Sequence, residues 1–192
     1  GAVNRLNAVV GDVLAFSREL RIRIVVVPVE TLISRAVESS GIGTTGVTVR
    51  LEGGGDLEIA CDPGLLEQAL ANLIRNAAEA SRDRGASEIV VSAAPSTLID
   101  GSGRRTAALG IRVCDEGAGF PEGARERVFN PFFTTREAGT GLGLAIVHRI
   151  IDAHTGRVSI WNNNEKEPGA EGATVEVVIP DAPEMFAEES HG

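Results

Sequence analysis

Residues 139–144 read Gly139-Thr140-Gly141-Leu142-Gly143-Leu144 and open the apolar stretch 142–154, which predicts a helix. Glycines at a helix N-terminus leave bare backbone N–H groups, and the helix dipole adds partial positive charge. The segment therefore predicts a site for an anion such as phosphate. A dinucleotide-binding fingerprint is the obvious competitor, but it needs the spacing Gly-x-Gly-x-x-Gly directly after a strand. Here the spacing differs and the glycines follow a polar stretch, so the Rossmann interpretation fails.

The stretch upstream, residues 116–140, is rich in glycine and charge and shows little periodicity. An irregular stretch of this length inside a compact domain is usually a functional lid. We therefore expect a lid beside the glycine segment.

The residues just before this stretch read Asp115-Glu116-Gly117-Ala118-Gly119 and follow the apolar strand 109–114. A carboxylate at a strand end can accept a hydrogen bond from an exocyclic amine, and glycines beyond it let the backbone approach a flat ring. The alternative is an ordinary strand-ending turn, because Asp and Gly are common turn residues.

A long helix is predicted over 63–82, with Asp62 as its N-cap and Pro63 in its first turn. Four polar residues form one stripe beside its apolar stripe, namely Gln68, Asn72, Asn76 and Glu79. Amide oxygens are hard neutral ligands of the kind that suits Mg²⁺. The alternative is a solvated helix face.

The other segments complete a pattern of strands and helices without strict βαβ regularity, which predicts an α+β two-layer sandwich. A helix is expected over 30–39, and strands over 24–29, 47–51, 57–61, 88–94, 108–114, 157–161 and 173–179. Pro28 limits the first strand to an edge. Strands 47–51 and 57–61 are expected to be joined by the turn Gly53-Gly54-Gly55.

The first twenty residues differ from the rest, because apolar residues fall on heptad a/d positions with one polar exception: Val3, Leu6, Val10, Val13, Ser17 and Leu20. Residues 2–20 therefore predict a helix that needs a partner helix. The alternative is an amphipathic helix packed on its own domain.

Composition excludes several classes of function. The chain has 192 residues, 27 Asp and Glu against 18 Lys and Arg, and a net charge of −9. This balance disfavours binding to nucleic acid or to an anionic membrane. Lys166 is the only lysine and follows Glu165, so there is no Walker A loop. No apolar run is long enough to span a bilayer, and we expect a cytoplasmic fragment whose full-length protein is free to carry a membrane anchor. Cys61 and Cys114 are expected to be buried.

The order of these motifs resembles the ATP-binding domain of sensor histidine kinases, which belong to the GHKL superfamily with the Bergerat fold. The Asn-rich helix comes first, followed by the Asp115 motif, by Asn130-Pro131-Phe132-Phe133-Thr134-Thr135-Arg136, and by the glycine segment. The resemblance covers roughly residues 30–180 and is greatest to kinases of the nitrogen-regulator type. It implies a mixed sheet covered by helices.

The resemblance also implies residue roles. Asp115 would hold the adenine amino group, and Asn76 would ligate Mg²⁺ with support from Asn72. Arg136, where the family often has lysine, would clamp the γ-phosphate. The ATP-binding set is Asn72, Asn76, Asp115, Gly117, Gly119, Arg136, Thr140, Gly141, Leu142, Gly143 and Leu144, with Arg136 and Asn72 as catalytic residues. Phe132 and Phe133 would anchor the lid by packing into the core.

The implied activity is transfer of the ATP γ-phosphate to a histidine, with onward transfer to an aspartate of a response-regulator receiver domain. Residues 1–22 resemble the end of the second helix of the family's dimerisation hairpin, 23–182 form the catalytic domain and 183–192 a flexible tail. None of the histidines, His148, His154 and His191, has the sequence context of the family's acceptor. We therefore expect a fragment that cannot autophosphorylate, taken from a homodimeric protein.

Two other functions fit the same motifs. An anti-sigma-factor-type serine kinase shares them, but such relatives usually begin at the first strand, without the helix over 2–20. A nucleotide-gated interaction module without kinase turnover is the non-enzymatic alternative.

Overall fold

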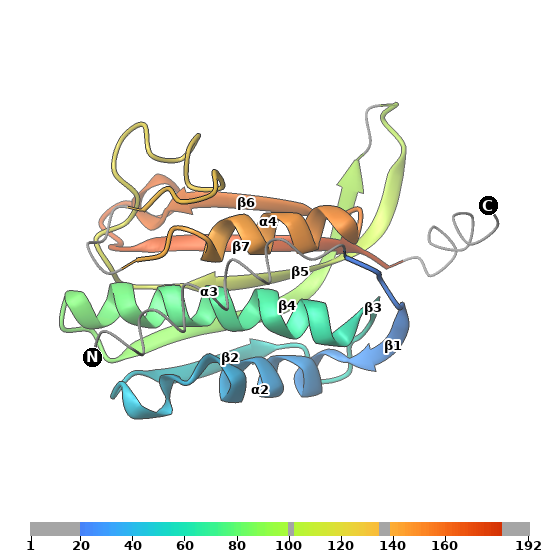
Figure 1. Ribbon diagram of the computed structural model, residues 1–192, viewed down its shortest axis with the longest axis horizontal. Coiled ribbons are helices and arrows are strands. Elements are labelled where there is room, and N and C mark those ends of the chain that lie inside the picture. The colour runs from blue at the N-terminus through green and yellow to red at the C-terminus, as the bar shows by residue number, and fades with distance from the viewer. Residues whose placement is uncertain (1–19, 100–101, 135–138, 182–192) are drawn as a thin grey trace.

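Helices cover one face of a mixed sheet in a computed structural model that describes residues 20–99, 102–134 and 139–181 (Figure 1). The five strands lie in the spatial order β2 (Thr48–Gly53), β4 (Glu88–Ile99), β5 (Arg105–Cys114), β7 (Ala173–Pro180) and β6 (Arg157–Asn162). β2 pairs with β4 in parallel, and the other pairs are antiparallel. The expected α+β two-layer architecture is therefore confirmed. The helix predicted over 2–20 and the tail 183–192 fall largely or wholly outside the described residues.

Three α-helices of the described chain form the second layer (Figure 1): α2 (Val29–Ser40), α3 (Pro63–Asp83) and α4 (Gly143–Ala153). Two short 3₁₀ turns accompany them, η1 (Ile42–Thr44) and η2 (Asn163–Glu165). α3 lies between the other two helices. Its start was predicted correctly, because the Asp62 carboxylate accepts a hydrogen bond from the Leu65 N–H at 3.0 Å. No described helix combines the length and apolar character that crossing a bilayer requires.

The core lies between α3 and the sheet. Leu66, Leu70 and Ile74 of α3 are fully buried, together with Ile89 and Ile111 from the sheet. Burying a side chain of this size stabilises the fold by about 1.5–3 kcal/mol. This packing fixes the polar stripe of α3 relative to the strand ends.

The three-glycine turn joins two strands as expected, but these strands do not pair with each other. β3 (Glu58–Cys61) pairs antiparallel with β1 (Val25–Pro28) in a separate two-stranded sheet, while β2 pairs with β4. The glycines serve close packing here, since a Cβ at Gly53 would lie 2.5 Å from the Ala93 carbonyl oxygen. Gly53, Gly54 and Gly55 thus turn the chain away from the sheet edge.

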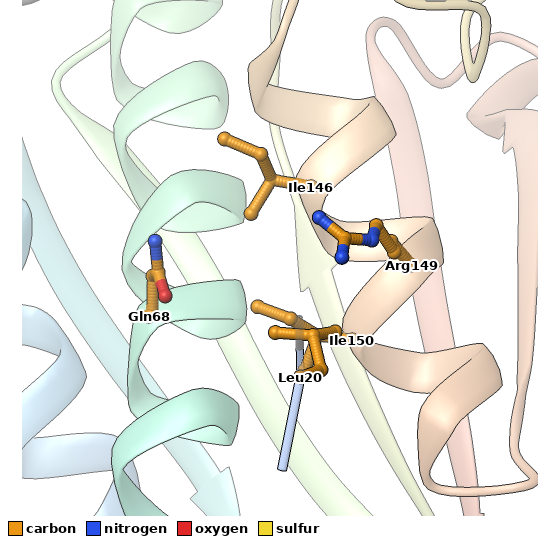
Figure 2. A pocket seen from close by; sticks show the side chains of 5 residues that line it. All are labelled: Leu20, Gln68, Ile146, Arg149 and Ile150. Atoms are coloured by element: carbon orange, nitrogen blue, oxygen red, sulfur yellow. The ribbon is translucent and has the colours of Figure 1, made fainter. Parts of the chain in front are cut away.

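The chain enters the helical layer between α3 and α4. Leu20 lines a small hollow there with Gln68 of α3 and with Ile146, Arg149 and Ile150 of α4 (Figure 2). Leu20 packs against the core although it is only partly buried. Gln68 therefore faces this seam at the first half of α3.

His154 joins the end of α4 to the start of α3 and has a structural role. The ring is fully buried, Nδ1 lies 2.7 Å from the Ile150 carbonyl, and Nε2 accepts the Asp62 N–H at 3.0 Å. Burial lowers the pKa of His154 from its ordinary value of 6.5, although the Ile150 carbonyl and the Asp62 carboxylate oppose this effect.

We expect the free energy of unfolding to decrease as the pH falls below about 6.5, where unfolded His154 takes up a proton that the folded chain resists. Below this pH the unfolded state binds more protons than the native state, so the free energy of unfolding decreases as the pH falls. Urea titrations at pH 7.5 and pH 5.5 measure the difference, and His154→Gln should reduce it. An unchanged pH dependence in that variant would contradict this role.

Candidate functional site

Asp115 stands directly after β5 and is held by the backbone of two segments. Its Oδ1 accepts hydrogen bonds from the Gly117 N–H at 2.8 Å and from the Ala173 N–H at 3.2 Å. Its own N–H donates to the Ala173 carbonyl at 2.9 Å, and the residue is only 8% exposed. A buried carboxylate in this fixed position can recognise a hydrogen-bond donor of a ligand.

The loop after Asp115 is packed against the second half of α3. A Cβ at Gly117 would lie 2.6 Å from the Ala80 Cβ and 2.9 Å from the Asp115 Oδ1, so this position admits only glycine. The Glu116 N–H donates to the buried Ser81 hydroxyl at 3.2 Å. The segment is therefore more than an ordinary strand-ending turn, because it fixes Asp115 relative to α3.

The two asparagines of α3 lie in different environments. Asn72 is 5% exposed and accepts a hydrogen bond from the Arg75 guanidinium, which argues against a solvated face at this position. Asn76 is half-buried and lies beside the start of α4, since a Cβ at Gly143 would be 3.4 Å from its Nδ2 and 3.8 Å from its Oδ1. The structure thus brings together Asn76 and the glycine segment.

The glycine segment forms the N-terminus of α4, as expected. Leu142 is the N-cap and its apolar side chain is buried, so it cannot cap the helix. Gly141 has φ +69°, and a Cβ there would collide with the Phe132 backbone. The Leu142 N–H donates to the Thr140 hydroxyl at 3.3 Å, and Leu144 packs partly buried against the core. The N–H groups of this first turn lie where the sequence predicts an anion site, and anion binding there stays a prediction.

The lid has no helix or strand within its described residues 116–134 and 139–140. Its expected anchoring through Phe132 is wrong, because that side chain is 66% exposed and the residue has φ +66°. Phe133 is half-buried, with the Arg127 guanidinium 4.6 Å from its ring centroid. The buried side chains of Ala124 and Val128 hold the segment instead. The Phe132 backbone lies close against Gly141 while its ring is exposed.

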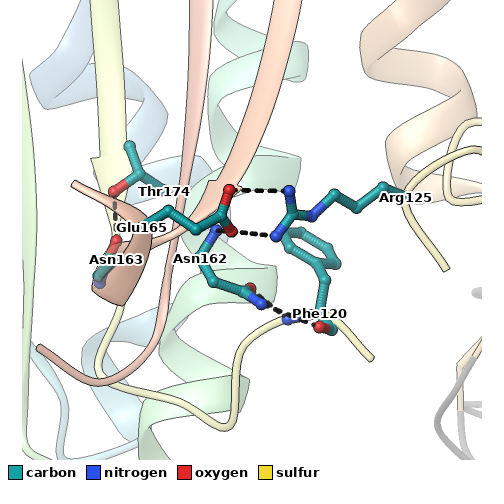
Figure 3. Close-up of polar contacts among 6 residues, drawn as sticks. All are labelled: Phe120, Arg125, Asn162, Asn163, Glu165 and Thr174. Atoms are coloured by element: carbon teal, nitrogen blue, oxygen red, sulfur yellow. Dashed lines mark hydrogen bonds and ion pairs between the residues drawn. The ribbon is translucent and has the colours of Figure 1, made fainter. Parts of the chain in front are cut away.

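Four polar residues that the sequence analysis did not assign hold the loop after Asp115 and the lid: Arg125, Asn162, Asn163 and Glu165 (Figure 3). The run Asn162-Asn163-Asn164 at the end of a strand was the available signal. The contacts of these asparagines depend on β6 lying beside β7, and the local sequence does not indicate that arrangement.

Most predicted site residues lie in one region. Asn72 and Asn76 lie on α3, and Asn76 contacts the start of α4, which residues 140–144 form; Gly117 lies between Asp115 and Ala80 of α3. Gly119 lies instead beside Asn162 and Gly172. Arg136 lies outside the described residues, so its position stays a prediction. Among the described residues no group of three or more His, Cys, Asp or Glu side chains could hold a metal ion.

The sequence of residues 61–183 matches the family described as histidine kinase-, DNA gyrase B-, and HSP90-like ATPase. The sensor histidine kinase ZraS of Escherichia coli K12 is 31% identical over 180 residues, which cover 92% of this chain and 35% of ZraS. The sensory histidine kinase/phosphatase NtrB of Rhodobacter capsulatus is 33% identical over 151 residues, or 74% of this chain and 40% of NtrB. The chain spans about a third of the length of the curated relatives it matches.

Two solved structures share the fold over nearly the whole chain. Full-length ShkA in complex with AMPPNP has a TM-score of 0.72 and 29% identity, covering 92% of this chain and 36% of ShkA. The histidine kinase ThkA in complex with the response regulator TrrA has a TM-score of 0.71 and 26% identity, covering 95% of this chain and 49% of that one.

Proposed function

Because the chain belongs to the family of histidine kinase-, DNA gyrase B- and HSP90-like ATPases, we propose that it binds ATP with Mg²⁺ and transfers the γ-phosphate to a histidine. NtrB is among its relatives, so the resemblance to kinases of the nitrogen-regulator type is confirmed. We assign residues 23–182 to the catalytic domain, residues 1–22 to the preceding hairpin and 183–192 to a tail.

The observation that carries this proposal is the position of the Asp115 carboxylate. Two backbone N–H groups orient it, and its loop packs on the same helix that presents Asn76 to the start of α4. Asp115 would accept a hydrogen bond from the adenine amino group, while Gly117 and Gly119 keep side chains away from the ring. The binding energy of the base would then position the phosphates for transfer.

The other end of the nucleotide would lie at the N-terminus of α4. Backbone N–H groups of Gly141, Leu142 and Gly143 would face the phosphates, with Thr140 and Leu144 shaping the turn and the helix start. Asn76 is the residue that would hold Mg²⁺, supported by Asn72, and the metal would neutralise phosphate charge. Arg136 would stabilise the charge of the transferring phosphoryl group.

The relatives support a proposal for the acceptor histidine and for the partner. His154 is fully buried with both ring nitrogens engaged, so it does not suit an acceptor. His148 is exposed, but it lacks the sequence context of the family's acceptor. We place the acceptor on the dimerisation hairpin of a homodimer. The ThkA complex supports a response-regulator receiver domain as the next phosphate carrier.

Calorimetry with a non-hydrolysable ATP analogue tests the proposal. We expect a Kd well below 1 mM that tightens at least about tenfold with Mg²⁺. Asn76→Leu removes the amide at similar volume, so it should retain metal-free binding and lose most of the gain from Mg²⁺.

Gln68→Leu is the matched control, because it makes the same change on the same helix outside the site. This variant should bind like the wild type, with and without Mg²⁺. If the wild type binds no nucleotide, kinase function is wrong and an interaction module becomes the better interpretation. If Mg²⁺ increased the affinity of Asn76→Leu as much as that of the wild type, Asn76 would not be the residue that holds Mg²⁺.

A further inference from the structure

The loop from Asp115 to Phe120 is held at both ends by two consecutive asparagines, Asn162 at the end of β6 and Asn163 at the start of η2. Figure 3 shows the contact of Asn162 with Phe120. We propose that Asn162 and Asn163 are positioning residues for recognition of the adenine base. This inference rests on the proposed function, because it assigns the control of base specificity within the same site.

Asn163 fixes the backbone at Asp115. Its Nδ2 donates to the Asp115 carbonyl at 2.9 Å and to the Glu171 carbonyl at 2.7 Å. Its Oδ1 accepts the hydroxyl of Thr174, a buried residue of β7, at 2.7 Å. The NH₂ group and the oxygen of the Asn163 amide thus all form hydrogen bonds, and these bonds fix the orientation of the amide. The Asp115 carbonyl is held by Asn163 while the Asp115 carboxylate is held by backbone N–H groups.

Asn162 fixes the other end of the loop. Its Oδ1 accepts the Phe120 N–H at 2.7 Å, and its Nδ2 donates to the Phe120 carbonyl at 3.1 Å. The side chain therefore pairs with Phe120 much as a neighbouring strand would. Gly119 has φ +73°, and a Cβ there would lie 2.7 Å from the Asn162 Oδ1. This close contact excludes other residues at position 119 and sets the path of the loop.

Glu165 supports Asn162 and connects it with the lid. Its Oε1 accepts the Asn162 N–H at 2.9 Å, and its carboxylate forms a two-point ion pair with Arg125, in which the Nη1–Oε2 distance is 2.9 Å (Figure 3). The Arg125 guanidinium lowers the pKa of Glu165. An ion pair this exposed adds little stability, so its effect is the placement of the lid relative to η2.

These contacts determine how closely Asp115 can discriminate between bases. A hydrogen bond to an exocyclic amine weakens steeply when the acceptor is displaced or rotated. Inosine triphosphate tests this, because it has a carbonyl oxygen where ATP has the amino group. A correctly placed carboxylate attracts the amine and repels the carbonyl. Loss of the asparagine contacts should therefore lower the preference for ATP over inosine triphosphate.

The three consecutive asparagines allow a test in which the same charge is added at adjacent positions. Asn163→Asp replaces the donating NH₂ with an oxygen that faces two carbonyls, and we expect ATP binding to weaken about 10–30-fold. Asn162→Asp keeps the acceptor oxygen and loses one donor, so we expect ATP binding to weaken about 3–10-fold. Asn164 is exposed, so Asn164→Asp should change binding less than about twofold and controls for the added charge.

The ratio of the two affinities distinguishes positioning from a merely structural effect. Binding of inosine triphosphate should change little in Asn163→Asp, so the ratio falls. A general loss of structure would instead weaken both nucleotides equally and would overturn the inference. Wild-type preference for ATP with an unchanged ratio in Asn163→Asp would also overturn it, while leaving the proposed function intact. Absence of nucleotide binding in the wild type would refute the proposed function itself.

A second pair of variants keeps the test decisive if Asn163→Asp does not fold. Thr174→Val removes the hydroxyl that orients the Asn163 amide, whereas Thr174→Ser retains it. We expect the valine variant to lose several-fold in the ATP to inosine triphosphate ratio and the serine variant to keep it. Equal ratios in the two variants would contradict the role of Asn163.

Discussion

Asp115→Asn should weaken binding of the ATP analogue about 100-fold, which corresponds to about 3 kcal/mol. The amide oxygen can still accept from the Gly117 and Ala173 N–H groups, so the fold is kept. The NH₂ group then replaces an acceptor with a donor that faces the adenine amine. Calorimetry measures the affinity, and urea denaturation verifies that the free energy of unfolding is close to that of the wild type.

Inosine triphosphate provides the ligand control for this variant. Inosine triphosphate lacks the amine, so its affinity should not fall in Asp115→Asn. In this variant the affinities for inosine triphosphate and for ATP should therefore become similar. If Asp115→Asn preferred ATP over inosine triphosphate as strongly as the wild type does, a group other than Asp115 would recognise the base.

Gly172→Ala has the largest expected effect on stability. Gly172 has φ +86°, and a Cβ there would collide with the Asp115 carbonyl and its neighbouring backbone. Positive φ and overpacking together should reduce the free energy of unfolding by about 2–4 kcal/mol. Urea denaturation measures this loss, and nucleotide binding should fall with it because Asp115 must move.

Gly169→Ala separates the two causes. Gly169 has φ +91° but open space around its Cβ position, so only the backbone strain applies and the expected loss is about 1 kcal/mol. If both variants lost the same stability, the contact between Gly172 and Asp115 would be unimportant.

The sequence predicted well whatever depends on local pattern. Asp62 and Pro63 indicate the start of α3, because both residues are typical of a helix N-terminus. The glycine segment likewise indicates the start of α4. Asp115 is a candidate because it follows an apolar strand and precedes closely spaced glycines, and the order of the motifs distinguishes it from an ordinary turn residue. These signals lie within a few residues of the features they specify.

The sequence failed where the partner is distant. β2 and β3 follow one another across a short glycine turn, yet each pairs with a strand that is not its neighbour along the chain. The resemblance implies that Phe132 packs into the core, but its ring is exposed and its backbone lies against Gly141, an arrangement that the local sequence does not indicate. Asn163 was missed because its partners come from three other segments.

The hydrogen bond between Asp115 and Ala173 joins residues 58 positions apart in the chain, across the lid and α4. Because closing so long a loop costs entropy, we expect this contact to form late in folding. The base-recognition part of the site is therefore complete only when β7 has joined β5. A nucleotide that binds there stabilises the native state alone, so it slows unfolding and leaves the rate of folding nearly unchanged.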